Sequence, residues 1–161
     1  MKIKVSILFI CFLVTFGCND TPKKESKPTT LEVIEKKAKE LNLILNSNDQ
    51  MQFDKKVLSA SPGQKVTLTL NHTGRGNKMI MGHNFVLLKS GIDVDDFARR
   101  AVEAIDSEYI PEGDEMIAYT TLIGGGETTS VTFEAPSTGI YTFICTFPAH
   151  YQLMKGQLIV K

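Results

Sequence analysis

Short apolar runs separated by turn residues fill the chain from Leu43 onward. Several of these runs alternate apolar and polar residues with a period of two, which is the pattern of half-buried β-strands. The clearest runs are 66–70, 84–88, 116–123, 130–135, 141–145 and 156–161. Segments rich in Gly, Pro, Ser and Asn lie between them and supply turns. Many short strands at this spacing predict an all-β sandwich or a small barrel.

Residues 92–111 follow a different period. Their apolar positions recur every three to four residues, at Val94, Phe97, Ala98, Ala101, Val102 and Ile105. Acidic residues precede this stripe and Pro111 follows it, as is typical of the two ends of a helix. The pattern predicts one amphipathic α-helix that packs on the sandwich.

The first seventeen residues differ again, with Lys2 and Lys4 followed by an apolar run that ends in a small residue before Cys18. This is the pattern of a secretory signal peptide, and the run is shorter than the roughly 20 residues of a membrane-spanning helix. The Gly-Cys ending resembles the lipobox of bacterial lipoproteins, which predicts a lipid-bearing Cys18 at the mature N-terminus. The alternative is a soluble exported protein that is cleaved nearby.

A polar segment connects this signal to the globular part. Residues 19–30 contain two prolines and no large apolar residue, which predicts a solvated tether. Thr29 and Glu32 form a capping-box pattern that opens a possible short helix reaching Leu41. We therefore expect a signal peptide over 1–17, a lipidated tether with a short helix over 18–45, and the folded domain over 46–161.

Charge and cysteine content narrow the range of possible functions. The 161 residues carry 18 basic and 18 acidic side chains, so no basic excess indicates nucleic-acid binding. Of the three cysteines, Cys11 is removed with the signal and Cys18 carries lipid, which leaves Cys145 without a disulfide partner. A lone thiol in an exported protein must be buried or bound to a metal.

The segment "CTFPAHYQLM" places Cys145, His150 and Met154 within ten positions. Thiolate, imidazole and thioether groups are ligands for soft or borderline metals, and a site of two histidines and one cysteine with a distant methionine is typical of copper that carries electrons. A second histidine must come from elsewhere, and on sequence grounds His83 and His72 are close competitors. The simpler interpretation of Cys145 is an inert buried thiol.

The segments "NDQMQF", "MGHN", "LIGGGE", "SVTF", "CTFPAH" and "LMKGQL" together resemble the azurins, bacterial blue-copper proteins of the cupredoxin fold. The resemblance runs from about Asn48 to Lys161. It implies a Greek-key β-sandwich of about eight strands with one inserted α-helix. It also implies an electron carrier, not an enzyme, with a single type 1 copper that cycles between Cu(I) and Cu(II).

The resemblance further implies a role for individual residues. The copper ligands would be His83, Cys145 and His150, with Met154 as a weak axial ligand and the carbonyl of Gly82 opposite it, and His72 would lie near the site without binding. The side chain of Asn84 would join the two ligand loops, and the amides of Asn84 and Phe147 would hold the sulfur. An apolar docking patch would surround the edge of His150, formed by Ile80, Met81, Phe147 and Ala149.

The same resemblance implies partners and location. We expect redox partners such as c-type cytochromes, copper nitrite reductases or peroxidases, and a periplasmic protein held to a membrane through Cys18. A copper storage or delivery protein is the alternative, whereas a filled mononuclear site disfavours a copper enzyme. Three departures from azurins stand out. The usual disulfide is missing, with Gly63 near one lost partner, Phe85 stands in place of a Trp, and Ala149 replaces a Gly.

Overall fold

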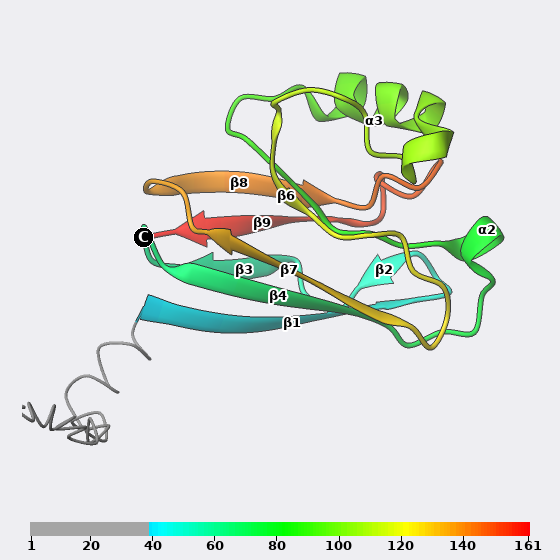
Figure 1. Cartoon of the computed structure of the whole chain (residues 1–161), viewed down its shortest axis with the longest axis horizontal. Coiled ribbons are helices and arrows are strands. Elements are labelled where there is room, and N and C mark those ends of the chain that lie inside the picture. Colours follow the sequence, from blue (N-terminus) through cyan, green and yellow to red (C-terminus); the bar gives the residue numbers. More distant parts are fainter. Residues whose placement is uncertain (1–38) are drawn as a thin grey trace, which may run out of the picture.

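The computed structural model describes residues 39–161, which form a sandwich of two β-sheets (Figure 1). One sheet has the strand order β2-β1-β4-β7, with β1 Glu40–Asn48, β2 Gln52–Phe53, β4 Lys65–His72 and β7 Thr128–Glu134. The other has the order β3-β9-β8-β5-β6, with β3 Val57–Ala60, β5 Val86–Leu88, β6 Met116–Tyr119, β8 Gly139–Ile144 and β9 Lys155–Val160. This confirms the predicted β-sandwich, with nine strands among the described residues where we expected about eight.

Alternation along the strands builds the core between the sheets. In β4 every second residue is buried, so Val66, Leu68 and Leu70 point inward while the residues between them are less buried. The same alternation buries Phe143 of β8, whose ring packs on Phe85 with centroids 5.3 Å apart. The alternation read from the sequence therefore sets which strand faces meet.

The first strand begins earlier than the sequence suggested. Strand β1 starts at Glu40 and pairs in parallel with β4 from Glu40 opposite Lys65, so the sheet includes residues assigned to the tether before 46. Leu41, which we assigned to a short helix, lies in this strand because it alternates with Leu43 and Leu45 toward one face. Residues 29–38 of that predicted helix, the tether, the signal peptide and Cys18 lie outside the described residues.

Two other strands are shorter than predicted. The run 116–123 forms β6 only as far as Tyr119, and Ile123 pairs separately with His83 as an isolated bridge. The run 84–88 becomes regular only at Val86. In both cases the chain leaves the sheet where it approaches the cluster of histidines described below.

The predicted helix is present as α3, Val94–Glu103, capped by the side chain of Asp93. Phe97, Ala98 and Ala101 of α3 are buried, and Phe97 and Ala98 pack in a small cluster against residues of β5 and β8. The predicted stripe is too long, because α3 ends before Ile105, which starts the 3₁₀ turn η1 (Ile105–Ser107) and is 62% exposed. A further one-turn helix, α2 (Lys78–Met81), was not predicted. None of the helices within residues 39–161 has the length and apolar character needed to cross a membrane.

Candidate metal centre

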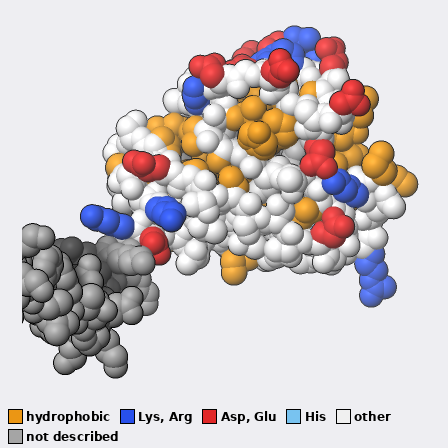
Figure 2. All heavy atoms as spheres, in the orientation of Figure 1, with side chains coloured by type: hydrophobic (Ala, Val, Ile, Leu, Met, Phe, Trp, Pro, Cys, Tyr) orange, Lys and Arg blue, Asp and Glu red, His pale blue; other side chains and the backbone are white. Residues whose placement is uncertain are grey.

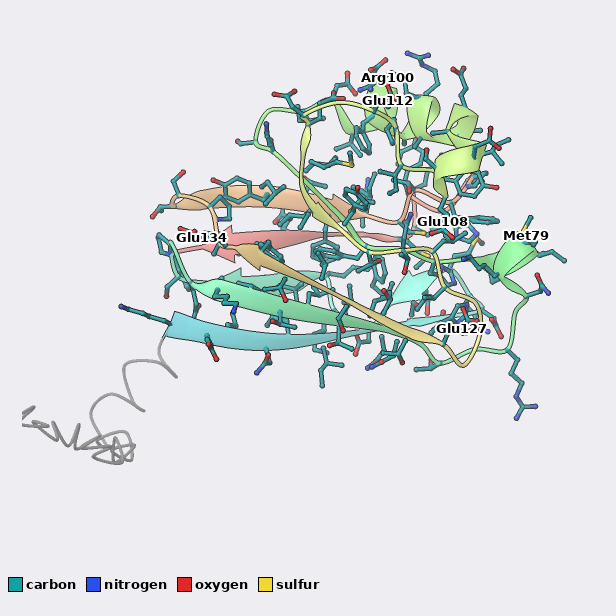
Figure 3. The ribbon with its side chains drawn as sticks, in the orientation of Figure 1. Met79, Arg100, Glu108, Glu112, Glu127 and Glu134 are labelled. Carbon is teal, nitrogen blue, oxygen red and sulfur yellow. The ribbon has the colours of Figure 1, made fainter. Side chains whose placement is uncertain are left out.

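Two loops meet at the end of the sandwich where α2 lies (Figure 1). One runs from α2 through Gly82 and His83 into β5, and the other joins β8 to β9 over residues 145–154. Strands β5 and β8 are antiparallel neighbours with Val86 opposite Ile144, so the residues just outside this pairing come together. Figure 3 labels Met79 and Glu108 at the same end.

His83, Cys145 and His150 form one buried group in which a ligand atom of each lies within 4.8 Å of the others. The Sγ atom of Cys145 lies 3.9 Å from Nδ1 of His83 and 3.8 Å from Nδ1 of His150. The exposed fractions are 0% for His83 and Cys145 and 3% for His150. A thiol thus faces two imidazole nitrogens in an enclosed space.

These distances suit a metal ion in a trigonal arrangement. Bonds of about 2.3 Å to sulfur and about 2.0 Å to nitrogen, the lengths typical of zinc, place sulfur and nitrogen about 3.7 Å apart when the bonds open at about 120°. The two sulfur–nitrogen separations, 3.9 and 3.8 Å, are close to this value. The donor set of one thiolate and two imidazoles is the one that type 1 copper uses, so the residues fit the ion.

Burial controls the protonation of all three groups in the metal-free protein. It lowers the pKa of His83 to about 3 and that of His150 to about 4, because a charged imidazolium is disfavoured away from water. It raises the pKa of the Cys145 thiol to about 12, although the amides of Asn84 and Phe147 act in the opposite direction. At neutral pH both imidazoles are therefore ready to bind a cation, and only the thiol must lose a proton.

The side chain of Asn84 joins the two loops. Its Oδ1 accepts a hydrogen bond from the amide of Thr146 at 2.9 Å, and its Nδ2 donates to the hydroxyl of Thr146 at 2.8 Å. The amide of Asn84 also acts on the sulfur of Cys145, as does the amide of Phe147. These contacts hold the thiol in place without any metal.

Gly82 and Met154 lie on the margins of the group. The carbonyl oxygen of Gly82 is 4.0 Å from Sγ of Cys145. Met154 is fully buried, and its carbonyl oxygen accepts a hydrogen bond from the amide of Cys145 at 3.0 Å. Gly82 thus lies beside the thiol and Met154 beside the backbone of Cys145, and their action on a bound ion belongs to the proposal below.

His72 belongs to β4 in the opposite sheet and takes a different role. Its ring lies next to that of His83, with centroids 4.3 Å apart. Its Nδ1 accepts a hydrogen bond from the amide of Gly74 at 3.1 Å, so the proton is on Nε2, which contacts the carbonyl of Met81 at 3.0 Å. Both ring nitrogens are occupied by backbone groups, and His72 lies outside the group of potential metal donors.

The four residues Phe147–His150 form a tight turn. The amide of His150 donates to the carbonyl of Phe147 at 3.0 Å, Pro148 occupies the second position, and Ala149 has a φ of +65° in the third. These are the features of a type II turn, whose third position favours Gly. Ala149 is therefore strained by its methyl group.

The predicted docking residues differ in exposure. Ile80 is 73% exposed and Ala149 is also exposed, but Met81 is only partly exposed and Phe147 is 8% exposed. The ring of Phe147 packs instead against His150 with centroids 4.7 Å apart. Sequence reasoning did not include Met79, which is 76% exposed on α2, where Figure 2 shows hydrophobic side chains projecting from the surface.

Sequence reasoning also missed Thr146 and Glu108, which contact the side chain of Asn84. Thr146 follows Cys145 directly, and that position is the only signal that could have pointed to it. No local pattern connects Glu108 with the histidines, because it lies beyond the end of α3.

Known proteins resemble this chain over the whole described region. The sequence profile described as copper binding proteins, plastocyanin/azurin family, matches residues 39–161. Azurin of Bordetella pertussis is 41% identical over 127 residues, which cover 75% of this chain and 84% of that protein. Outer membrane protein H.8 of Neisseria gonorrhoeae is 42% identical over 118 residues, which cover 71% of this chain and 64% of that protein.

A solved structure agrees with these sequence relatives. Auracyanin A, a "blue" copper protein from Chloroflexus aurantiacus, superposes with a TM-score of 0.70 at 33% identity. The match covers 76% of this chain and 99% of auracyanin A.

Proposed function

Because the chain belongs to the plastocyanin/azurin family of copper-binding proteins, we propose that it is an electron carrier with one type 1 copper cycling between Cu(I) and Cu(II). The observation that carries this proposal is the buried group of His83, Cys145 and His150, with one thiol between two imidazole nitrogens. Copper held there supplies reversible one-electron chemistry. The protein acts as a carrier and not as an enzyme.

The surrounding residues keep this site in one arrangement. His83, Cys145 and His150 are the proposed ligands, and Gly82 and Met154 are proposed as weaker contacts through the carbonyl and the thioether. The hydrogen bonds of Asn84 fix the loops before a metal arrives. A site that does not rearrange suits both oxidation states, and its burial leaves no open position for a substrate.

We propose that electrons enter and leave near His150, through the apolar surface of Met79, Ile80 and Ala149. His150 is the more exposed of the two proposed histidine ligands, and Phe147 packs against its ring. A small apolar surface suits the brief contacts of redox complexes. Partners such as c-type cytochromes, copper nitrite reductases or peroxidases fit this role.

Copper storage or delivery is the alternative and is less favoured. A delivery protein must release its metal at each encounter, whereas here the thiol is buried and both loops are held by hydrogen bonds. The decisive property is electron exchange without metal loss.

The test adds a charge to the proposed contact surface. Ile80→Lys should leave copper content and colour unchanged and slow both electron self-exchange and reduction by a c-type cytochrome. The slowing of self-exchange should be greatest at low salt, because ions screen the repulsion between like charges over about 10 Å at 0.1 M. Ile140→Lys is the control, since Ile140 is 57% exposed and lies at the opposite end of β8 from Cys145. Equal rates in both variants, or copper transfer to the partner, would favour delivery.

We further propose that the protein is exported to the periplasm and anchored to a membrane by lipid on Cys18. The signal-like residues 1–17 support this, and so does the similarity to a protein named as an outer membrane protein. The full-length protein should fractionate with membranes and carry an acyl mass at Cys18, and Cys18→Ser should carry none. An unmodified Cys18 in the mature wild-type protein would contradict the anchor.

A further inference from the structure

Glu108 occupies an unusual position in the loop after η1. Its φ is +57° and that of Tyr109 is +65°, so two successive residues with side chains adopt the left-handed conformation. This conformation is unfavourable for residues that carry a Cβ atom, so the surroundings must hold both residues there. Glu108 lies at the end of the sandwich where Figure 3 labels it, and its carboxylate reaches Lys78 of α2 and the amide of Leu122.

Each oxygen of the Glu108 carboxylate holds a different segment. Oε1 pairs with Nζ of Lys78 at 2.5 Å, and Oε2 accepts a hydrogen bond from the amide of Leu122 at 2.9 Å. These two contacts lower the pKa of Glu108. The carbonyl of Glu108 also accepts a longer bond from Nδ2 of Asn84 at 3.4 Å. One residue thus connects α2, the loop after β6 and the residue that follows His83.

Lys78 and Leu122 are also the residues that enclose Gly82. A Cβ atom placed on Gly82 would lie 2.4 Å from the carbonyl oxygen of Lys78 and 2.9 Å from Cδ2 of Leu122. A side chain at position 82 would therefore clash with both, and Gly82 packs closely against them. The position of its carbonyl, 4.0 Å from the Cys145 sulfur, depends on where these two neighbours are held.

We propose that Glu108 is a positioning residue that sets the Gly82 carbonyl and the adjacent His83 relative to Cys145. It acts through Lys78 on one side of Gly82 and through Leu122 on the other, and it binds no metal itself. The effect of Glu108 on a bound ion rests on the proposed copper function. Its effect on the backbone at Gly82 is present in the metal-free protein.

The test compares Glu108→Ala, which removes both contacts, with Glu108→Gln, which keeps an acceptor for the Leu122 amide and loses the charge pair with Lys78. Glu112→Ala is the matched control, because Glu112 is an exposed carboxylate in the same loop. In the metal-free protein, NMR should show shifted amide resonances of Gly82 and His83 in Glu108→Ala, smaller shifts in Glu108→Gln, and none in the control. In the copper protein, Glu108→Ala should alter the thiolate-to-copper absorption and weaken copper binding by about 10–100-fold, as for other residues that support metal ligands.

A purely structural role predicts a different result. If Glu108→Ala lowers the melting temperature but leaves the Gly82 and His83 resonances, the absorption and the copper affinity equal to those of the control, the proposal is wrong. Should Glu108→Ala fail to fold, Glu108→Gln and Lys78→Met decide, since each removes the same charge pair and should shift the same two amides. Unshifted amides in both would overturn the proposal. If the amides shift but the copper protein exchanges no electrons, the proposed function is wrong and the positioning role of Glu108 still holds.

Discussion

Replacing Ala149 by Gly should stabilise the protein, although it removes atoms. Ala149 is exposed, so its methyl group adds little burial, and its φ of +65° places that methyl in the strained left-handed region. This strain costs about 1–2 kcal/mol. Gly in turn gives the unfolded chain more freedom, which costs about 0.4–1 kcal/mol. The difference favours Gly by about 0.8 kcal/mol, or about 3 °C in melting temperature for a domain of this size.

Ala104→Gly provides the control. Ala104 is partly buried with a φ of −88°, so it carries no left-handed strain and should lose about 0.4–1 kcal/mol on substitution. The two Ala→Gly variants should therefore change the free energy of unfolding in opposite directions. The gap between them, about 1.5 kcal/mol, measures the strain at Ala149.

Urea-induced unfolding of the metal-free protein, followed by far-UV circular dichroism, is a suitable assay because the chain contains no Trp. The copper-free form removes any contribution of the ion to stability. If Ala149→Gly loses as much free energy as Ala104→Gly, the turn at Phe147–His150 is not strained and the argument fails.

Copper(II) uptake at about pH 7 should release about one proton, because the Cys145 thiol has a pKa of about 12 while both imidazoles are already neutral. Calorimetry in buffers of different ionisation enthalpy measures the number of protons released, and a release of two or more would contradict this prediction. The metal-free protein should lose stability as the pH falls from about 7 to about 5, because the pKa values of His83 and His150 are depressed on folding and the unfolded chain takes up protons first. A free energy of unfolding that stays constant over this pH range would refute the lowered pKa values of the two histidines. Cys145→Ser should abolish the blue colour, whereas Met154→Leu should keep copper and raise the reduction potential, as the site becomes more apolar; loss of all copper from Met154→Leu would make Met154 a principal ligand.

The sequence by itself determined the strands and the helix that can be recognised from the spacing of neighbouring apolar residues. Alternating residues predicted the core strands, and a 3.6-residue period predicted α3, because the period depends only on neighbouring positions. The cluster of Cys145, His150 and Met154 is equally local, since one short loop between β8 and β9 carries all three residues. The alternation of Leu41, Leu43 and Leu45 was also present in the sequence, and a competing helix pattern obscured it.

Residue spacing alone left His83 and His72 as close competitors, the resemblance to azurins favoured His83, and the tertiary structure supplies the physical reason. Both stand at strand boundaries, and the spacing from Cys145 does not separate them. His72 ends β4 in one sheet, whereas His83 leads into β5, which pairs with β8 in the other sheet and so brings His83 to the thiol. Sheet membership depends on which faces the core buries, and that is a property of the whole domain.

The features that support the proposed ligands could be found only in the tertiary structure, for the same reason. Glu108 reaches Lys78 and Leu122 across 30 and 14 positions of sequence, at the end of a helix whose packing sets its direction. The positive φ of Ala149 likewise could not be predicted from the residue type, because Ala rarely adopts a positive φ and here a turn held at both ends imposes it. Local periodicity thus fixed the elements and the metal-binding loop, while long-range pairing and packing decided which distant groups complete the site.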